Sequence, residues 1–222
     1  RDPAWSRMKL KPLPISRNEE THTYFWEPTG EKLSYSTTQI IGINKTQKQI
    51  EAIEKTKDIW APRGKHVHLC LEKYLTGEVI PDPGDYEEWI VPLLEHDFWQ
   101  EFEPWAVEYM LCDLKKSVGG QLDVLGYDHK NKELVLLDLK TQGSARASRY
   151  NTDAQLGSYL HALIDHHKLN VEACRTIWAR PGKTILGPNQ NIDECGIAWL
   201  NAWEKFVAIN EMTNAINEAS IL

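Results

Sequence analysis

The sequence predicts an α/β fold, in which a small central mixed β-sheet is flanked by helices and preceded by an N-terminal β-hairpin and a helical region. The prediction rests on a change of period along the chain. Apolar residues recur at helical spacing before about residue 102 and after about residue 152, whereas residues 106–141 contain three short runs of β type. Helices, three strands, a helix, a strand and a final helix, in that order, are typical of an α/β domain.

The first predicted element is a β-hairpin over residues 22–36, in which β-prone segments lie on either side of a Pro-Thr-Gly turn at residues 28–30. Ser36 or Thr37 then caps a short helix. We expect this hairpin to lead directly into the helical region.

Two helices are predicted next, over residues 45–60 and 65–76, because Pro-Arg-Gly at residues 62–64 interrupts the helical pattern. Gly77 ends the second helix. An acidic amphipathic helix follows and extends to about Phe102.

Three strands are predicted at residues 106–111, 120–127 and 133–141, and residues 128–132 form the turn between the last two. The remaining elements are a helix over 152–166, a strand over 174–179 and a terminal helix over 196–217. The chain has 222 residues and no repeat or low-complexity linker, which predicts one domain over 1–222. Within it we distinguish an N-terminal hairpin and helices (1–105), a sheet core (106–185) and a C-terminal helix (186–222).

Composition narrows the class of protein. No apolar run approaches the roughly 20 residues needed to span a bilayer, so we expect no membrane partner. The four cysteines form no CxxC pair and no zinc spacing, which predicts reduced, buried thiols in an intracellular protein. The net charge of −7 predicts weak nonspecific binding to duplex DNA, although one acidic block at residues 66–114 dominates it and mildly basic stretches lie on both sides.

The strand at residues 133–141 is apolar except for an acid, Asp138, and a base, Lys140. Because side chains in a strand alternate with a period of two, both lie on the same face. Charges at the end of a buried strand are costly to desolvate without partners. A structural ion pair is one interpretation of this pattern, and an active site is the other.

The preceding strand favours the active site, since it carries a single acid, Asp123, within an apolar alternation. If the two strands pair as a hairpin, Asp123 and Asp138 lie close together. Neighbouring carboxylates raise each other's pKa unless a cation lies between them, and a hard divalent cation resolves that conflict. Lys140 could orient a water molecule or neutralise a phosphate. The three residues therefore predict metal-assisted phosphodiester hydrolysis.

Asp123, followed after a turn by Asp138-Leu139-Lys140, resembles the active-site motif of the PD-(D/E)XK nuclease superfamily. The resemblance implies a restriction-endonuclease-like core and a Mg²⁺ or Mn²⁺ cofactor. It also implies that Asp123, Asp138 and Lys140 are catalytic, and that the metal is bound by both aspartates, by the backbone carbonyl of Leu139 and by His68.

Further motifs follow the family's order within residues 22–160. Arg63-Gly64, with His68 and Glu72 on a helix that ends at Gly77, resembles the metal-site helix of RecB-like nucleases. The cysteines that bind an iron–sulfur cluster in some of these relatives are absent, so no cluster is expected.

Gln155 and Tyr159, at helical spacing i, i+4, resemble the Q-x-x-x-Y motif of the same nucleases and are expected to support the site and touch DNA. Residues 33–41 resemble the entry segment of the mitochondrial genome maintenance exonuclease group, although Tyr35 departs from its usual valine. Glu108 is either a supporting acid, as in some relatives, or a surface carboxylate.

Contacts to DNA are expected first from Arg146 and Arg149, which lie in the polar loop at residues 142–152. Lys115, Lys116 and Arg63 are further candidates. Trp26 and Trp60 are weaker candidates for stacking on unpaired bases.

These resemblances imply a Mg²⁺- or Mn²⁺-dependent DNA exonuclease of repair, recombination or replication-end processing. Its substrate would be single-stranded DNA or DNA with free ends, and its partner a replication or recombination protein. A structure-specific endonuclease or nickase on the same fold stays open, as does a non-catalytic nucleic-acid-binding subunit, which the intact Asp/Asp/Lys set disfavours.

We expect an intracellular, cytoplasmic protein, or a viral protein in host cytoplasm. A mitochondrial location stays open because a chain that begins without Met is compatible with a trimmed N-terminus. Polarity and oligomeric state are left open.

Overall fold

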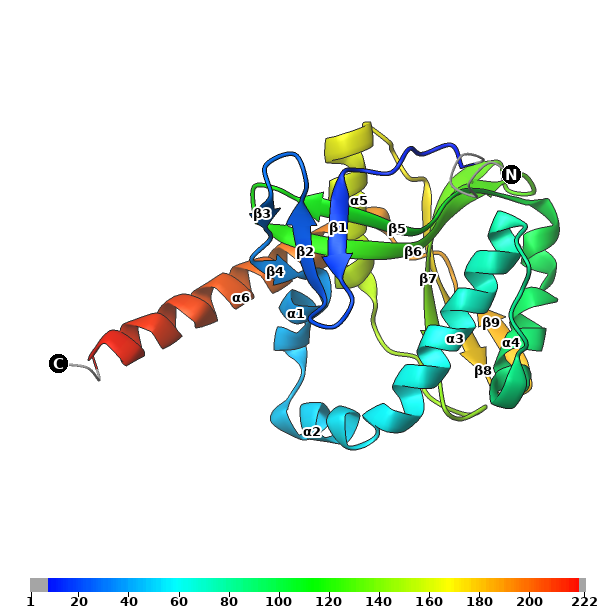
Figure 1. Ribbon diagram of the computed structural model, residues 1–222, viewed down its shortest axis with the longest axis horizontal. Helices are drawn as coiled ribbons and strands as arrows, with labels where there is room; N and C mark the ends of the chain where they lie inside the picture. The colour runs from blue at the N-terminus through cyan, green and yellow to red at the C-terminus, as the bar shows by residue number, and fades with distance from the viewer. Residues whose placement is uncertain (1–7, 220–222) are drawn as a thin grey trace.

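A six-stranded mixed β-sheet forms the centre of the fold in the computed structural model, which describes residues 8–219 and the side chains of residues 8–213 (Figure 1). The strand order is β4-β6-β7-β8-β9, and β5 pairs with β6. The strands are β4 (Tyr35–Ser36), β5 (Phe102–Asp113), β6 (Val118–Asp128), β7 (Glu133–Thr141), β8 (Ala173–Arg180) and β9 (Lys183–Leu186). The α/β fold with a mixed sheet flanked by helices is therefore confirmed.

The β6–β7 hairpin has the predicted form. The two strands pair antiparallel from Asp128↔Glu133 to Val124↔Leu137. The helix α5 (Asp153–His167) then returns the chain so that β8 runs parallel to β7. β9 was not predicted; it pairs antiparallel with β8 across a tight turn at Gly182.

The N-terminal hairpin differs in part from the prediction. β2 (Thr23–Trp26) and β3 (Glu31–Lys32) form the hairpin, and β1 (Ile15–Asn18) adds a third strand to this small sheet. The predicted return strand was wrong beyond Lys32, because Tyr35 and Ser36 instead form β4, which pairs parallel with β6 in the central sheet. The central sheet therefore extends beyond residues 106–185, and the ends of the 1–222 prediction lie outside the described residues.

The break between the first two predicted helices lies earlier in the chain than expected. Ser36 caps α1 (Thr37–Ile41), as expected, and a 3₁₀ turn (Gly42–Asn44) leads to α2 (Gln47–Lys55). The break lies at Thr56, and α3 (Lys57–Thr76) continues through Pro62 to Gly77. Proline removes only one helical hydrogen bond, and α3 offsets that cost by burying Val67, Cys70 and Leu71 against the sheet.

The acidic helix is shorter than predicted. After a 3₁₀ turn (Gly84–Tyr86), α4 covers only Glu87–Leu94, and a second 3₁₀ turn (Asp97–Glu101) leads into β5 at Phe102. His96 has an extended backbone, and its Nδ1 accepts a hydrogen bond from the Phe98 N–H, so its side chain caps the new turn rather than continuing the helix.

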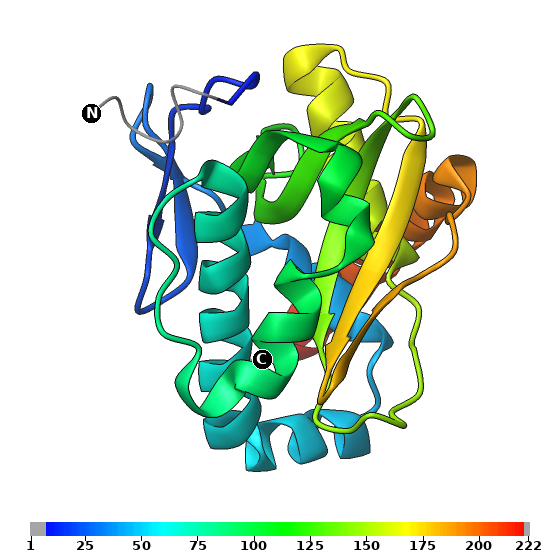
Figure 2. The same cartoon turned by 90° about the vertical axis from the view of Figure 1, so that its right-hand side faces the viewer.

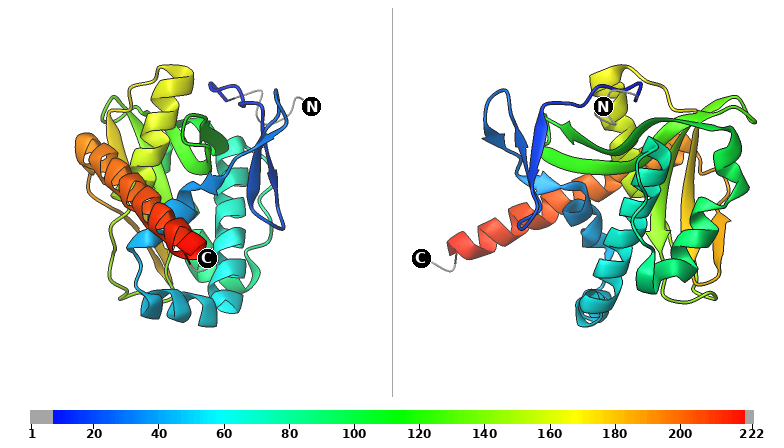
Figure 3. Two further views of the ribbon diagram at one scale, coloured as in Figure 1. Left: turned by 90° about the vertical axis from the view of Figure 1, so that its left-hand side faces the viewer. Right: turned by 45° about the vertical axis from the view of Figure 1, so that its right-hand side comes forward.

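Helices cover both faces of the sheet (Figure 2). α3 and α4 pack on one face, against Val124, Val135 and Leu137. α5 and α6 (Ile192–Ala219) pack on the other face, against Leu125 and Leu136. The C-terminal half of α6 projects away from the sheet (Figure 3).

Two further sequence predictions bear on the class of protein. All four cysteines are free and buried, as predicted. Among residues 8–219, no helix combines the length and the apolar character that crossing a membrane requires.

Candidate metal centre

The predicted site residues lie where one edge of β6 changes partner. On this edge β4 pairs with Val118 and Gly119, whereas β7 pairs with residues 124–128. Residues 120–123 of β6 pair with neither strand, although β5 pairs along the other edge. Asp123 immediately precedes Val124 and Asp138 immediately follows Leu137, the last β6–β7 pair, so the hairpin brings both aspartates to the same split in the sheet.

His68, Glu108 and Asp123 form a cluster at this split. Their potential ligand atoms all lie within 4.8 Å of one another. His68 Nδ1 lies 2.9 Å from Glu108 Oε1 and 3.5 Å from Asp123 Oδ1. Three different elements, α3, β5 and β6, supply the three side chains, so the cluster depends on the assembled fold.

Glu108 reaches the cluster through an unusual backbone conformation. Its φ of 46° lies in the left-handed region, which costs a residue other than glycine about 1 kcal/mol or more. Gln121 Nε2 donates a 2.7 Å hydrogen bond to Glu108 Oε2, and Arg17 in turn donates to Gln121 Oε1 at 2.7 Å. The Glu108 carboxylate is therefore held beside His68 and is only partly exposed, and its role as a supporting acid stays a prediction.

Asp138 and Lys140 start a second chain of contacts. Lys140 Nζ donates to Asp138 Oδ1 at 2.8 Å and to Gln155 Oε1 at 2.8 Å. Gln155 Nε2 then donates to the Tyr159 hydroxyl at 3.1 Å. Both motif residues of α5 thus lie on the helix face turned toward β7, where the sequence placed them.

One oxygen of Asp138 is left without a partner. The Asp138 side chain is 0% exposed, and Oδ2 has no hydrogen-bond partner among the described residues. An unpaired buried carboxylate oxygen is energetically costly, and a bound cation would satisfy it.

Electrostatic interactions couple these groups. Burial by itself lowers the pKa of His68, but the charge of Asp123 and the hydrogen bond with Glu108 outweigh it and raise the pKa to about 9. Burial raises the pKa of Asp138 to about 6, even though Lys140 opposes the shift. Burial also raises the pKa of Asp123, with His68 opposing. The site thus holds three carboxylates but only two cationic side chains, so its negative charge is not fully neutralised.

The donor set fits a hard divalent cation. Carboxylates and one imidazole are ligands that Mg²⁺ and Mn²⁺ accept. The compact cluster contains Glu108, which was expected only as a supporting acid, and does not include Asp138, whose Oδ1 accepts a hydrogen bond from Lys140. The backbone N–H of Leu139 donates a hydrogen bond to Asp123 Oδ2. That the Leu139 carbonyl binds the metal stays a prediction.

The residues expected to contact DNA differ in how exposed they are and in whether they already have a partner. Arg146 and Arg149 are exposed in the loop after β7, and Lys115 is exposed in the β5–β6 turn. Lys116 pairs with Asp113 at 2.9 Å. Arg63 is only 7% exposed and lies over the Trp89 ring at 5.1 Å, so burial leaves it little surface for a phosphate, and we reassign it to packing.

The two tryptophans proposed for stacking are also placed. Trp60 is partly exposed, and its Nε1 donates to the Ile53 carbonyl. Trp26 lies in β2, with its ring centroid 6.1 Å from that of His166.

The two residues that hold Glu108 in place, Gln121 and Arg17, were not identified from the sequence. Gln121 lies two residues before Asp123 in the same strand, so the strand period could have placed it on the same face. Arg17 is 104 residues from Gln121, and no local pattern connects them.

No protein-family model and no curated protein sequence matches the chain. The structures of 22 solved chains do match. One is the crystal structure of SSO0001, which is 15% identical, with a TM-score of 0.45 over 81% of this chain and 78% of that chain. Similarity at this level says nothing about the residues of the candidate metal centre.

Proposed function

We propose that the protein is a Mg²⁺- or Mn²⁺-dependent DNA exonuclease. The observation that carries the proposal is the buried Asp138 carboxylate, whose Oδ1 is paired with Lys140 while Oδ2 has no partner. A buried carboxylate oxygen without a protein partner is costly, and a bound divalent cation would satisfy it. The cluster of His68, Glu108 and Asp123 at the same split supplies further ligands.

A metal ion bound by Asp123, Asp138, Glu108 and His68 would supply Lewis-acid catalysis and neutralise phosphate charge. The ammonium of Lys140 stabilises negative charge that develops on the scissile phosphate. Gln155 holds that ammonium through its 2.8 Å hydrogen bond, and Tyr159 holds Gln155. Lys140 is thus kept in one position in the absence of substrate.

The choice of DNA and of exonucleolytic cleavage rests on the resemblance of residues 33–41, of the α3 motif around His68 and of Gln155/Tyr159 to RecB-like exonucleases. Exposed Arg146 and Arg149 are available to the phosphate backbone. We extend the proposal to an intracellular role in repair, recombination or replication-end processing, together with a replication or recombination protein.

The test is digestion of end-labelled single- and double-stranded oligonucleotides with Mg²⁺, with Mn²⁺ and with EDTA. We expect metal-dependent release of nucleotides from strand ends, and loss of activity in Asp138→Asn and Lys140→Ala. Glu133→Gln, which alters an ion-paired acid at the opposite end of β7, is the matched control. Full activity of the Asp138→Asn or Lys140→Ala protein in the presence of metal would refute the proposal.

A circular single strand separates exonuclease from endonuclease, because only an endonuclease cuts it. We expect the circle to remain intact while the same sequence in linear form is degraded.

A further inference from the structure

A pocket of about 230 Å³ lies on the α5 face of the sheet, one strand away from the candidate metal centre. Its floor includes Thr176 and Trp178 of β8. In the parallel pairing of β7 and β8, Asp138 lies opposite Thr176 and Lys140 lies opposite Trp178. Paired residues point to the same face, and neighbouring strands are about 4.8 Å apart. The pocket therefore adjoins the residues proposed to act on the scissile phosphate.

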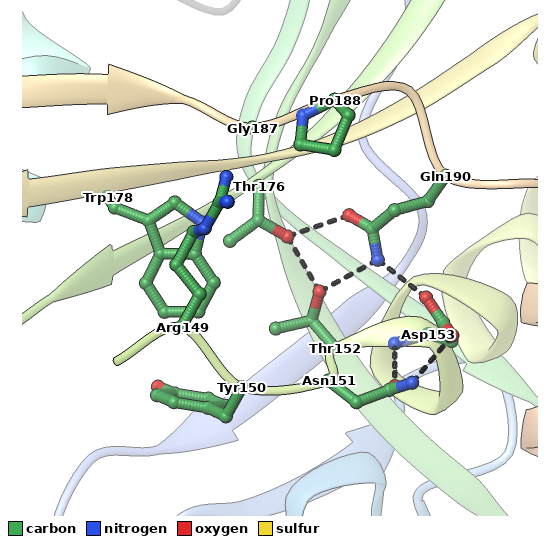
Figure 4. Close-up of a pocket in the computed structure, with 10 residues that line it drawn as sticks. All are labelled: Arg149, Tyr150, Asn151, Thr152, Asp153, Thr176, Trp178, Gly187, Pro188 and Gln190. Atoms are coloured by element: carbon green, nitrogen blue, oxygen red, sulfur yellow. Dashed lines mark hydrogen bonds between the residues drawn. The ribbon is translucent and has the colours of Figure 1, made fainter. Parts of the chain in front are cut away.

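One side of the pocket is aromatic and cationic (Figure 4). Tyr150 is 56% exposed, and its ring meets Trp178 edge to face, with the centroids 4.9 Å apart. Arg149 precedes Tyr150 and is also exposed. The buried Trp178 thus supports the ring of Tyr150 from one side, while much of that ring stays available to a ligand.

The opposite side of the pocket is polar but already hydrogen-bonded within itself (Figure 4). Gln190 Nε2 donates to Thr152 Oγ1 and to Asp153 Oδ1, and Gln190 Oε1 accepts from Thr176. Both amide protons of Gln190 are therefore used, and this residue has none left for reading the edge of a base. A ligand here would be held by stacking and charge, which are tolerant of base identity.

We propose that this pocket binds one unpaired nucleobase of the DNA strand being cut, stacked on Tyr150, with Arg149 on the adjacent phosphate. The inference rests on the proposed function, because it requires a DNA strand at the metal centre. It goes further by assigning one base of that strand to a defined pocket. A base within a duplex is stacked and paired, and it could enter the pocket only at the cost of unstacking and unpairing, so the pocket favours a strand that is single-stranded next to the scissile phosphate.

The test measures binding separately from cleavage. A labelled oligothymidine is titrated in Ca²⁺ with the wild type, Tyr150→Ala, Tyr150→Phe and Tyr74→Ala. Tyr74 is the matched control, since it is 37% exposed on α3 and lies outside the pocket. We expect Tyr150→Ala to weaken binding about 5- to 150-fold, which corresponds to the loss of one base–aromatic stack. Tyr150→Phe keeps the ring and should bind like the wild type, as should Tyr74→Ala.

A series of strands with a single abasic residue, moved along the sequence, locates the stacked base. One abasic position should weaken wild-type binding and abolish the difference between the wild type and Tyr150→Ala. The inference is wrong if Tyr150→Ala binds as tightly as the wild type, if the difference persists at every abasic position, or if the wild type binds no single strand.

Cleavage of the same strand with Mg²⁺ keeps the two proposals distinguishable. Tyr150-dependent binding without any cleavage would contradict the nuclease and retain the base pocket. Metal-dependent cleavage with no contribution of Tyr150 to binding would retain the nuclease and contradict the pocket.

Discussion

Leu139 and Asp123 are joined across the β6–β7 hairpin by a hydrogen bond of 2.6 Å from the backbone N–H of Leu139 to Asp123 Oδ2. The bond occupies one carboxylate oxygen, and the other, Oδ1, lies 3.5 Å from His68 Nδ1. The hairpin backbone therefore orients the carboxylate before any metal is bound, which is how hydrogen bonds to ligand residues usually prepare a metal site.

We expect Asp123→Asn to remove metal binding while the fold is retained. The amide oxygen of asparagine could still accept the bond from Leu139, but the ligand charge is lost. Calorimetric titration with Mn²⁺ should give no binding heat at concentrations that saturate the wild type, and the circular dichroism spectrum should be unchanged. Asp113→Asn is the control, because Asp113 pairs with Lys116 away from the cluster. Wild-type Mn²⁺ affinity in Asp123→Asn would exclude Asp123 as a ligand.

Lys140 and Gln155 should act as a unit. Removal of a single group that stabilises transition-state charge typically costs about 10²- to 10³-fold, which we expect for kcat in Lys140→Ala. Gln155→Ala leaves the ammonium in place but unheld, so we expect a loss of about tenfold with Mn²⁺ affinity unchanged. In the Lys140→Ala background, Gln155→Ala should have no further effect. Additive losses in the double variant would show that Gln155 acts independently of Lys140.

The pH dependence of the metal-free protein should report on His68. Its pKa of about 9 in the fold exceeds the value of about 6.5 in an unfolded chain, so protonation stabilises the folded state. That contribution is complete below about pH 6.5 and is lost as pH rises through about 9. In EDTA, the wild-type Tm should therefore fall between about pH 6.5 and 8, and His68→Gln should flatten this fall. His129→Gln, which alters an exposed histidine, should behave like the wild type. An equal slope in His68→Gln would contradict the assignment.

Salt dependence separates the arginines that contact DNA from those that pack. Each phosphate contact to a single strand contributes about 0.7 to the slope of log affinity against log salt concentration. We expect Arg146→Ala to reduce the slope by about this amount without changing Tm. Arg63→Ala should leave the slope unchanged and lower Tm, because its guanidinium lies over Trp89. The reverse pattern would restore Arg63 as a DNA contact.

The parts of the centre that local sequence patterns predicted are those whose neighbours are close in the chain. Asp123 and Asp138 lie at the same end of the hairpin because two alternating strands are joined by a short turn, and Gln155 and Tyr159 share a face because they are four residues apart. Asp138 and Lys140 follow the strand period in the same way.

The parts that could not be predicted depend on contacts between distant segments. β4 has only two residues, and its pairing with Val118 and Gly119 has no signature in local period. The place of Glu108 in the cluster follows from its left-handed backbone and from its position between Val107 and Tyr109, which pair with Val124 and Leu122 on either side of Asp123. The continuation of α3 through Pro62 likewise reflects burial against the sheet, which outweighs the local preference for a break.

Gly157 sets the distance between α5, which carries Gln155, and α6. A Cβ atom at this position would overlap the backbone carbonyl of Cys195 and would lie 2.9 Å from Trp199 Cβ. Overpacking of this kind typically costs about 1–3 kcal/mol, so we expect Gly157→Ala to lower Tm by about 2–12 °C in differential scanning calorimetry. Gly196→Ala is the control on α6, since its Cβ would meet only His161 Nε2 at 3.5 Å, and alanine favours a helix over glycine by about 1 kcal/mol. Its Tm should rise. A stabilised Gly157→Ala would mean that α5 and α6 separate readily, and Lys140 would then be held less firmly than its hydrogen bond to Gln155 indicates.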